Sequence, residues 1–299
     1  MKILLRNQIY IENPPPEISS FLKQLLAFPD PTYLEAKKFN RFTKHLRKEI
    51  IQYKIEGNYL VIPSGYLLDL LELCAALGIE SELEDETVHP LGDWPESSIA
   101  LRENQKPAVE TMVCFERGFL VAEAGSGKTV IGLEIARRLG YKTLWLTHQN
   151  QLMKQAIERA ESFLGINYKD IGQIRGDKET IGKHLTVGMV PTLLRRPGSP
   201  IEREFGTVIV DEAHHIVSRT FLEVVGRFWA KHIYGLTATP YRRDQLDHAM
   251  FNAVGPILYT IRQKELVEEE ELMVPSVIRV DTGWMVYGSE NLSFQDLTS

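Results

Sequence analysis

Cysteine is scarce in this chain of 299 residues, which contains only Cys74 and Cys114. Neither stands at a metal-ligand spacing, so the sequence gives no sign of a cysteine-bound metal. Apolar residues flank both positions. We therefore expect two reduced thiols in the core of a protein from a reducing compartment.

Long apolar runs are missing as well. The chain has no run of about 18 apolar residues, the length that a membrane-spanning helix needs, so we expect no membrane partner. The apolar start at residues 3–5 is interrupted at Arg6, too soon for a signal peptide. These absences predict a cytoplasmic protein, or a nuclear one in a eukaryote, and not a secreted one.

Basic residues are absent between Asp69 and Glu96, where acidic residues and two prolines occur. Such a stretch is typical of an interdomain linker. The net charge of −6 disfavours a dedicated nucleic-acid coat protein but allows a local basic surface. Because the length suits about two domains, we predict a small mixed α/β domain over residues 1–90. We expect it to be followed by a linker to about residue 97, a larger α/β domain over 98–275 and a separate segment over 276–299.

Apolar spacing in the first 90 residues predicts short elements. We expect a hairpin over 3–5 and 9–11, a helix from 18 to 26, and a second helix through Lys37 to about His45. Strands over 50–55 and 59–62 follow, and Ser64 is expected to cap a helix that ends at Gly78.

The second of these helices would separate charge from apolar side chains. One face would carry Lys37, Arg41, Lys44 and Lys48, and the opposite face Phe39, Phe42 and Leu46. Two interpretations stay open at this point: a surface that contacts nucleic-acid phosphates, or an ordinary solvated helix face.

A phosphate-binding loop stands out at residues 119–129. An apolar strand precedes a turn of small residues, and a helical pattern follows up to Gly140. Backbone N–H groups of such a turn, with Gly125, Ser126 and Gly127, hold phosphate oxygens. Lys128 would bridge the β- and γ-phosphates of ATP, and the Thr129 hydroxyl would ligate Mg²⁺. Ala122 replaces the first glycine of the usual pattern.

Strands and helices alternate after this loop. Strands are expected over 119–122, 143–147, 185–189, 208–210 and 233–236, with helices over 149–163 and 220–230 between them. This order predicts a parallel sheet, in which ligands bind at the carboxyl ends of the strands.

Two further clusters follow strands of that sheet and should meet the loop at the same edge. In the first, Asp211 would hold Mg²⁺ and Glu212 would orient or deprotonate the attacking water. His214 would sense the γ-phosphate and pass that state to the second cluster, Thr237 and Thr239. Taken singly, the acidic pair could be a strand-end cap and the threonines a turn.

The ordered motifs resemble those of superfamily 2 helicases. They are Leu101–Gln105, Ala122–Thr129, the DEAH sequence Asp211–His214 and Gly235–Pro240. Residues 241–244, 255–259 and 264–266 resemble the branch that contains XPB and UvsW. The resemblance implies a RecA-like domain with helices on both faces of a parallel sheet, preceded by a small duplex-engaging domain.

The resemblance also assigns residues. It places Gln105 against adenine, with Arg102 of the same motif among the nucleotide-binding residues. It places residues 147–155, with His148 and Gln149, against the nucleic-acid backbone. Family members often carry threonine near Met189, and here Thr192 is the candidate substitute.

One expected part of the family pattern is missing: no motif after Val274 supplies the arginines of a second RecA-like domain. Residues 275–299 resemble the entry into such a domain, which we therefore count as a partner. The favoured interpretation is an ATP-dependent helicase or translocase, with DNA preferred over RNA. The alternatives are the motor subunit of a restriction or nuclease system, and a module that binds nucleotide and nucleic acid without turnover.

Overall fold

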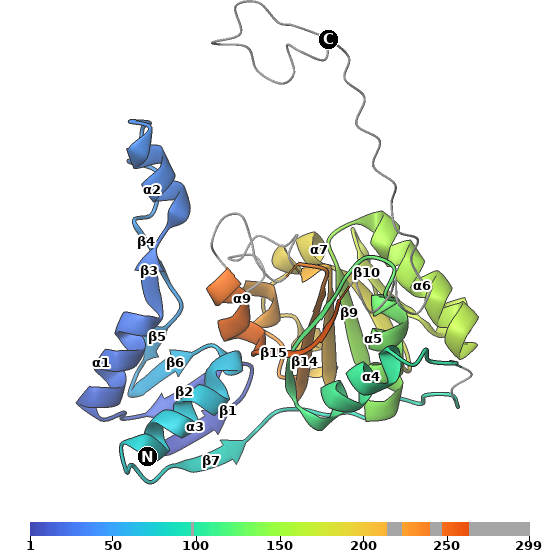
Figure 1. Cartoon of the computed structure of the whole chain (residues 1–299), viewed down its shortest axis with the longest axis horizontal. Helices are drawn as coiled ribbons and strands as arrows, with labels where there is room; N and C mark the ends of the chain where they lie inside the picture. The colour runs from blue at the N-terminus through green and yellow to red at the C-terminus, as the bar shows by residue number, and fades with distance from the viewer. Residues whose placement is uncertain (97–98, 214–222, 240–246, 263–299) are drawn as a thin grey trace, which may run out of the picture.

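Two β-sheets organise the computed structural model, which describes residues 1–96, 99–213, 223–239 and 247–262 (Figure 1). The larger sheet has eight strands in the order β11-β10-β12-β9-β13-β14-β8-β15. Its strands are β8 Arg117–Ala122, β9 Thr143–Thr147, β10 Gly172–Arg175, β11 Lys178–Thr180, β12 Leu185–Met189, β13 Thr207–Asp211, β14 His232–Thr237 and β15 Ile257–Ile261. Each neighbouring pair is parallel except β10 with β11. The predicted parallel α/β fold is confirmed.

Helices cover both faces of this sheet. One face packs on α4 (Gln105–Cys114), α5 (Lys128–Leu139) and α6 (Asn150–Leu164), and the fully buried Trp145 lies in this layer. The other face packs on α7 (Val190–Leu194), the short helix η3 (Pro200–Arg203) and α9 (Asp247–Val254). Because both faces are covered, the central strands are buried along their whole length, and their apolar runs need no alternating pattern.

The smaller sheet belongs to the first 85 residues. Its order is β5-β6-β2-β1-β7, from β1 Lys2–Leu5, β2 Ile9–Glu12, β5 Lys54–Glu56, β6 Tyr59–Ile62 and β7 Glu82–Asp85. It packs on α1 (Pro16–Leu25) and α3 (Leu67–Ala76) around a core of its own. The predicted hairpin over 3–5 and 9–11 is present. The strand expected over 50–55 is instead two strands, Glu49–Ile51 and Lys54–Glu56, of which only the second pairs with β6.

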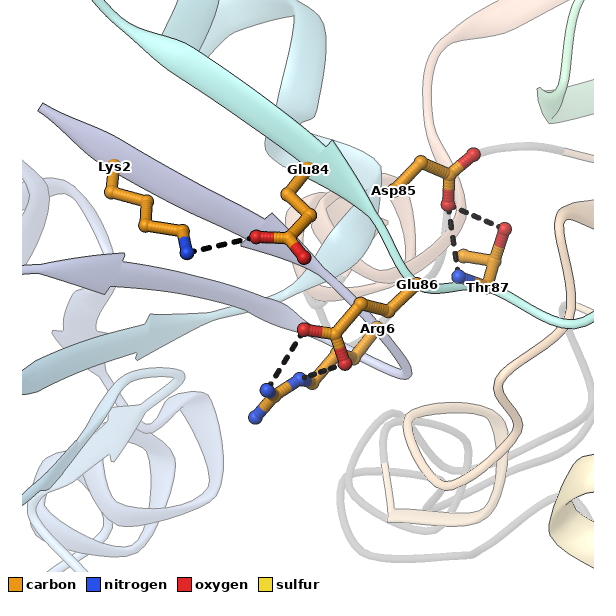
Figure 2. Close-up of polar contacts among 6 residues, drawn as sticks. All are labelled: Lys2, Arg6, Glu84, Asp85, Glu86 and Thr87. Carbon is orange, nitrogen blue, oxygen red and sulfur yellow. Dashed lines mark hydrogen bonds and ion pairs between the residues drawn. The ribbon is translucent and has the colours of Figure 1, made fainter.

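Ion pairs hold β7 to the amino-terminal strand (Figure 2). Lys2 Nζ lies 2.9 Å from Glu84, and the Arg6 guanidinium donates to both carboxylate oxygens of Glu86. Asp85 caps the turn that follows by accepting from the Thr87 amide and hydroxyl. Part of the acidic stretch is therefore a strand with a fixed register, which pairs with the start of the chain.

A strap, residues 87–94, continues along the amino ends of the large sheet. The Val88 amide donates to Trp229 O and the Gly92 amide to Gly140 O, and Pro90 O accepts from the Lys142 amide. The Trp94 indole donates to Tyr141 O at 2.8 Å. The strap thus adds backbone hydrogen bonds to the edge opposite the expected ligand-binding edge.

The turn after β6 docks on α9, which alters the expected role of Ser64. Ser64 lies in the short helix η1 (Ser64–Tyr66) and caps no helix with its side chain. Its hydroxyl donates to Ala253 O and accepts from the buried Arg117 guanidinium at 2.8 Å. The capping prediction was wrong because a tertiary partner competes for the hydroxyl. Burial lowers the pKa of Arg117 to about 10, although the carboxylates of Glu116 and Asp85 oppose the shift.

The arm, residues 27–51, projects from the small sheet (Figure 1). Strands β3 (Ala27–Pro29) and β4 (Glu49–Ile51) pair antiparallel, and α2 (Pro31–Lys38) follows β3. The predicted helix through His45 was wrong beyond Lys38. Asn40 has φ 50°, and the Arg41 amide donates to Ala36 O, which together make a left-handed helix end. The two helical faces proposed for this segment therefore do not exist.

Two other sequence predictions need correction. Cys74 is buried as expected, but Cys114 is exposed at the end of α4. Of the helix expected over 220–230, residues 223–225 are helical and residues 226–229 are not, while residues 220–222 lie outside the described ranges. Within those ranges, no helix has the length and apolar content to cross a membrane.

Candidate nucleotide-binding site

The loop between β8 and α5 forms a cradle of backbone groups. Gly125 and Gly127 have φ of 86° and 79°, in the left-handed region where a side chain is strained. Lys128 is the first residue of α5 and is 9% exposed, with its ammonium donating to Ala122 O at 3.0 Å. Thr129 is half-buried beside it. This is a strand, a glycine turn and a helix amino terminus, the arrangement that holds phosphate.

Gln105 braces this loop from the amino end of α4. Its Nε2 donates to Ser126 O at 2.9 Å, and its Oε1 accepts from the Arg102 amide. A Cβ on Gly127 would lie 2.5 Å from that Nε2, so a side chain there would displace the Gln105 amide in addition to straining the backbone at φ 79°. Arg102 is exposed, and its guanidinium donates to Gly125 O at 3.4 Å.

The acidic pair lies at the end of β13, two strands away from β8. Asp211 pairs in register with Leu236, and Thr237 with Val121, so the three strand ends share one edge. Glu212 Oε1 lies 3.6 Å from Lys128 Nζ. Burial, and then the neighbouring Glu212 charge, raise the pKa of Asp211 to about 6, while Lys128 opposes the shift.

Glu212 has an unusual backbone. Its φ is 49°, and the other described residues with positive φ are glycines and two asparagines. A glutamate rarely adopts this conformation, which costs free energy. With this backbone at the end of β13, the Glu212 carboxylate lies 3.6 Å from the Lys128 ammonium.

The third cluster, Thr237 and Thr239, is held by hydrogen bonds between its own two residues. The Thr237 hydroxyl donates to Thr239 O at 2.9 Å and accepts from the Thr239 amide. Thr237 is fully buried beside the loop strand. His214, expected to couple the acidic pair to these threonines, lies outside the described residues.

The residues expected to contact nucleic acid differ in their exposure to solvent. Gln149 is exposed before α6 and His148 is half-buried. Thr192 is 9% exposed, and its hydroxyl accepts from the Gly176 amide, so it is not on the open surface. Lys37, Arg41, Lys44 and Lys48 are all exposed on the arm.

The chemistry of the site suits a nucleoside triphosphate with Mg²⁺. The fully buried Ser126 Oγ has no hydrogen-bond partner within the described chain. A hydroxyl and a carboxylate, on Thr129 and Asp211, are hard oxygen donors of the kind that Mg²⁺ prefers. No group of three or more metal-binding side chains occurs among the described residues. Mg²⁺ commonly needs none, since phosphates and waters complete its shell.

The fold and this edge define a RecA-like nucleotide-binding domain. The sequence profile of the family described as Type III restriction enzyme, res subunit, matches residues 98–242. The crystal structure of the UvsW helicase from bacteriophage T4 has a TM-score of 0.66 at 17% identity, covering 86% of this chain and 99% of that chain. That likeness extends over both sheets and concerns the fold.

Two sequence relatives carry the comparison further. The DNA 3'-5' translocase XPB2 of Sulfurisphaera tokodaii is 31% identical over 189 residues, 62% of this chain and 42% of that protein. Protein L396 of Acanthamoeba polyphaga mimivirus, named provisionally as an ATP-dependent RNA helicase, is 28% identical over 244 residues, 79% of this chain and 45% of that protein. By these matches the chain is similar to superfamily 2 helicases of the branch that contains XPB and UvsW. It matches less than half the length of either relative.

Proposed function

We propose that this chain is part of an ATP-dependent DNA helicase or translocase that acts on duplex or branched DNA. The observation that carries the proposal is the meeting of Lys128, Asp211 and Glu212 at one sheet edge, with Glu212 Oε1 3.6 Å from Lys128 Nζ. DNA is preferred because the XPB2 protein, 31% identical to this chain, is named as a DNA translocase. The relative named for RNA makes duplex RNA a necessary comparison.

Each residue of the site has a part in this proposal. Ser126 and the glycines hold phosphate oxygens, Lys128 compensates their charge, and Thr129 and Asp211 hold Mg²⁺. The Glu212 carboxylate orients or deprotonates the attacking water. Gln105 contacts the adenine while it braces the loop. Thr237, Thr239 and His214 pass the nucleotide state onward.

The division of labour along the chain is part of the same proposal. Residues 1–90 engage nucleic acid, and residues 98–275 hold the nucleotide. His148 and Gln149 contact the nucleic-acid backbone. Arginines of a second RecA-like domain stabilise the charge that develops on the transferred phosphoryl group, which is typically worth about 10³–10⁵ in rate. We therefore expect these 299 residues to bind ATP with Mg²⁺ but to hydrolyse it near background until such a domain is supplied.

The test is ATP turnover with duplex DNA, branched DNA or duplex RNA, in the chain alone and fused to a second RecA-like domain. In the fusion, Glu212→Gln keeps the shape of the side chain and removes the base, so turnover should fall by roughly 10²-fold or more while ATP stays bound. Unchanged turnover in this variant would show that another residue orients or deprotonates the attacking water. Stimulation by RNA and not by DNA would overturn the DNA preference.

A restriction or nuclease motor is a second candidate, supported by the description of the matching family. Under that candidate, ATP turnover on DNA would be accompanied by strand cleavage when a nuclease subunit is added. DNA movement or unwinding without cleavage favours the helicase.

A further inference from the structure

The tip of the arm exposes two aromatic side chains that have no role in the fold. Phe39 is 57% exposed and Phe42 is 68% exposed. A single exposed apolar side chain is ordinary. Here two phenylalanines stand within four residues on a segment that projects from the rest of the molecule (Figure 1). Neither belongs to the core cluster of the small sheet.

Cations surround these rings. The Arg41 guanidinium lies 5.4 Å from the Phe39 ring centre, and Lys38 Nζ lies 5.9 Å from it. Between Ala36 and Lys48 the chain has six lysines and arginines and no acidic residue. An apolar protein surface would have to strip water from these charges, whereas a polyanion is attracted by them. The tip therefore fits nucleic acid.

Two aromatic rings at the arm tip stack on each other and present a flat face. Phe42 and His45 are stacked, with ring centres 5.5 Å apart and planes 19° apart. A nucleobase that lies on such a pair extends the stack, and cations beside the ring take the phosphates on either side. Phenylalanine has no hydrogen-bonding group, so this contact would not select a base sequence.

His45 also lines a groove at the base of the arm. The groove has a volume of about 670 Å³, and its walls include Arg47 and Lys54 together with Ala253 of α9. The stacked pair thus adjoins a groove that reaches the helix on which the small sheet docks. Basic side chains and a planar ring thus occur together along this groove, beside the carboxylates of Asp30, Glu49 and Glu223.

We propose that the arm tip stacks unpaired bases, so that the chain prefers a fork or junction to an uninterrupted duplex. Within a duplex both faces of each base are covered by its neighbours, and only ends, forks and single strands offer a free face. The proposal rests on the nucleic-acid function proposed above and names the structural feature of the substrate that the arm recognises.

The experiment compares the affinity of the 299-residue chain for a forked DNA and for a blunt duplex of equal length, by fluorescence anisotropy. In the blunt duplex only the two terminal base pairs have a free face, so it offers far fewer stacking sites than the single-stranded arms of the fork. In the double variant Phe39→Leu/Phe42→Leu, fork binding should weaken about 5- to 100-fold, the range expected when stacking with a base is lost, while duplex binding holds. Phe42→Trp should keep fork affinity, and its added fluorescence should be quenched by the fork and not by the duplex.

Phe21→Leu is the matched control, because Phe21 is a 46% exposed phenylalanine on α1, the helix that packs on the small sheet. It should change neither affinity. Equal weakening on fork and duplex, or no weakening on either, overturns the stacking proposal and leaves the proposed function standing. Failure of the parent chain to bind any DNA or RNA counts against the proposed function itself.

Discussion

Replacing Lys128 by alanine tests the nucleotide site directly. The ammonium is buried, and its polar neighbours are Ala122 O at 3.0 Å and the Glu212 carboxylate at 3.6 Å. When ATP arrives, the same ammonium faces phosphate oxygens. A unit charge pair about 4 Å apart in a partly buried site is worth about 4 kcal/mol, part of which repays desolvation.

We therefore expect Lys128→Ala to weaken ATP binding by about 2–4 kcal/mol, or roughly 30- to 1000-fold in Kd. Isothermal titration of the 299-residue chain with ATP and Mg²⁺ measures this. Lys106→Ala is the control, because Lys106 is exposed on α4 and pairs with Glu103 outside the cradle. A Kd for Lys128→Ala equal to that of the parent would refute the phosphate-binding role of the loop.

The remaining predictions concern the arm, the core and the docking interface. Neutralising the four arm cations Lys37, Arg41, Lys44 and Lys48 should flatten the salt dependence of duplex binding, by about 0.9 in the slope of log K for each lost phosphate contact. An unchanged slope would favour the interpretation that these four cations are only a solvated surface. Burial, and then the nearby charges of Lys231 and Arg117, lower the pKa of His232 to about 4 in the folded protein. As the pH falls below about 6.5, the unfolded chain therefore binds a proton at His232 that the folded protein does not bind. Stability should thus be unaffected above pH 6.5 and fall by on the order of 3 kcal/mol down to pH 4, and His232→Phe should reduce that fall in urea unfolding; an equal fall in the variant would contradict this. A Cβ on Gly65 would lie 2.6 Å from Asn252 O, so Gly65→Ala should cost roughly 1–3 kcal/mol in thermal unfolding, and an unchanged Tm would show that the interface yields.

The arrangement of the candidate nucleotide site was predictable because its signals are local. A buried strand, a glycine turn and an amphipathic helix are encoded within residues 119–139, and an apolar run over 208–210 precedes Asp211. Parallel pairing then brings the strand ends to one edge. The left-handed backbone of Glu212 carried no such signal, because glutamate is not a residue that favours positive φ.

The arm helix shows where periodicity misleads. Apolar residues continue at helical spacing past Lys38, yet Asn40 ends the helix in the left-handed conformation. Asparagine at this position is a recognised helix-end signal, and it was outweighed by the pattern of Phe39, Phe42 and Leu46. The course of the strap was not predictable, because its partners are backbone groups of segments far away in the sequence.

The strap has a practical consequence for anyone who shortens this protein. The family match begins at residue 98, and a chain that starts there keeps all the nucleotide-site residues named above. It would nevertheless lose the carbonyl of Pro90, which accepts from Lys142, and the indole of Trp94, which donates to Tyr141 O. The start of β9 and the Tyr141 ring, which lies edge-on to His89 of the strap at 5.8 Å, would then face water. A soluble ATP-binding fragment should therefore begin before Thr87, eleven residues ahead of the point that sequence similarity suggests.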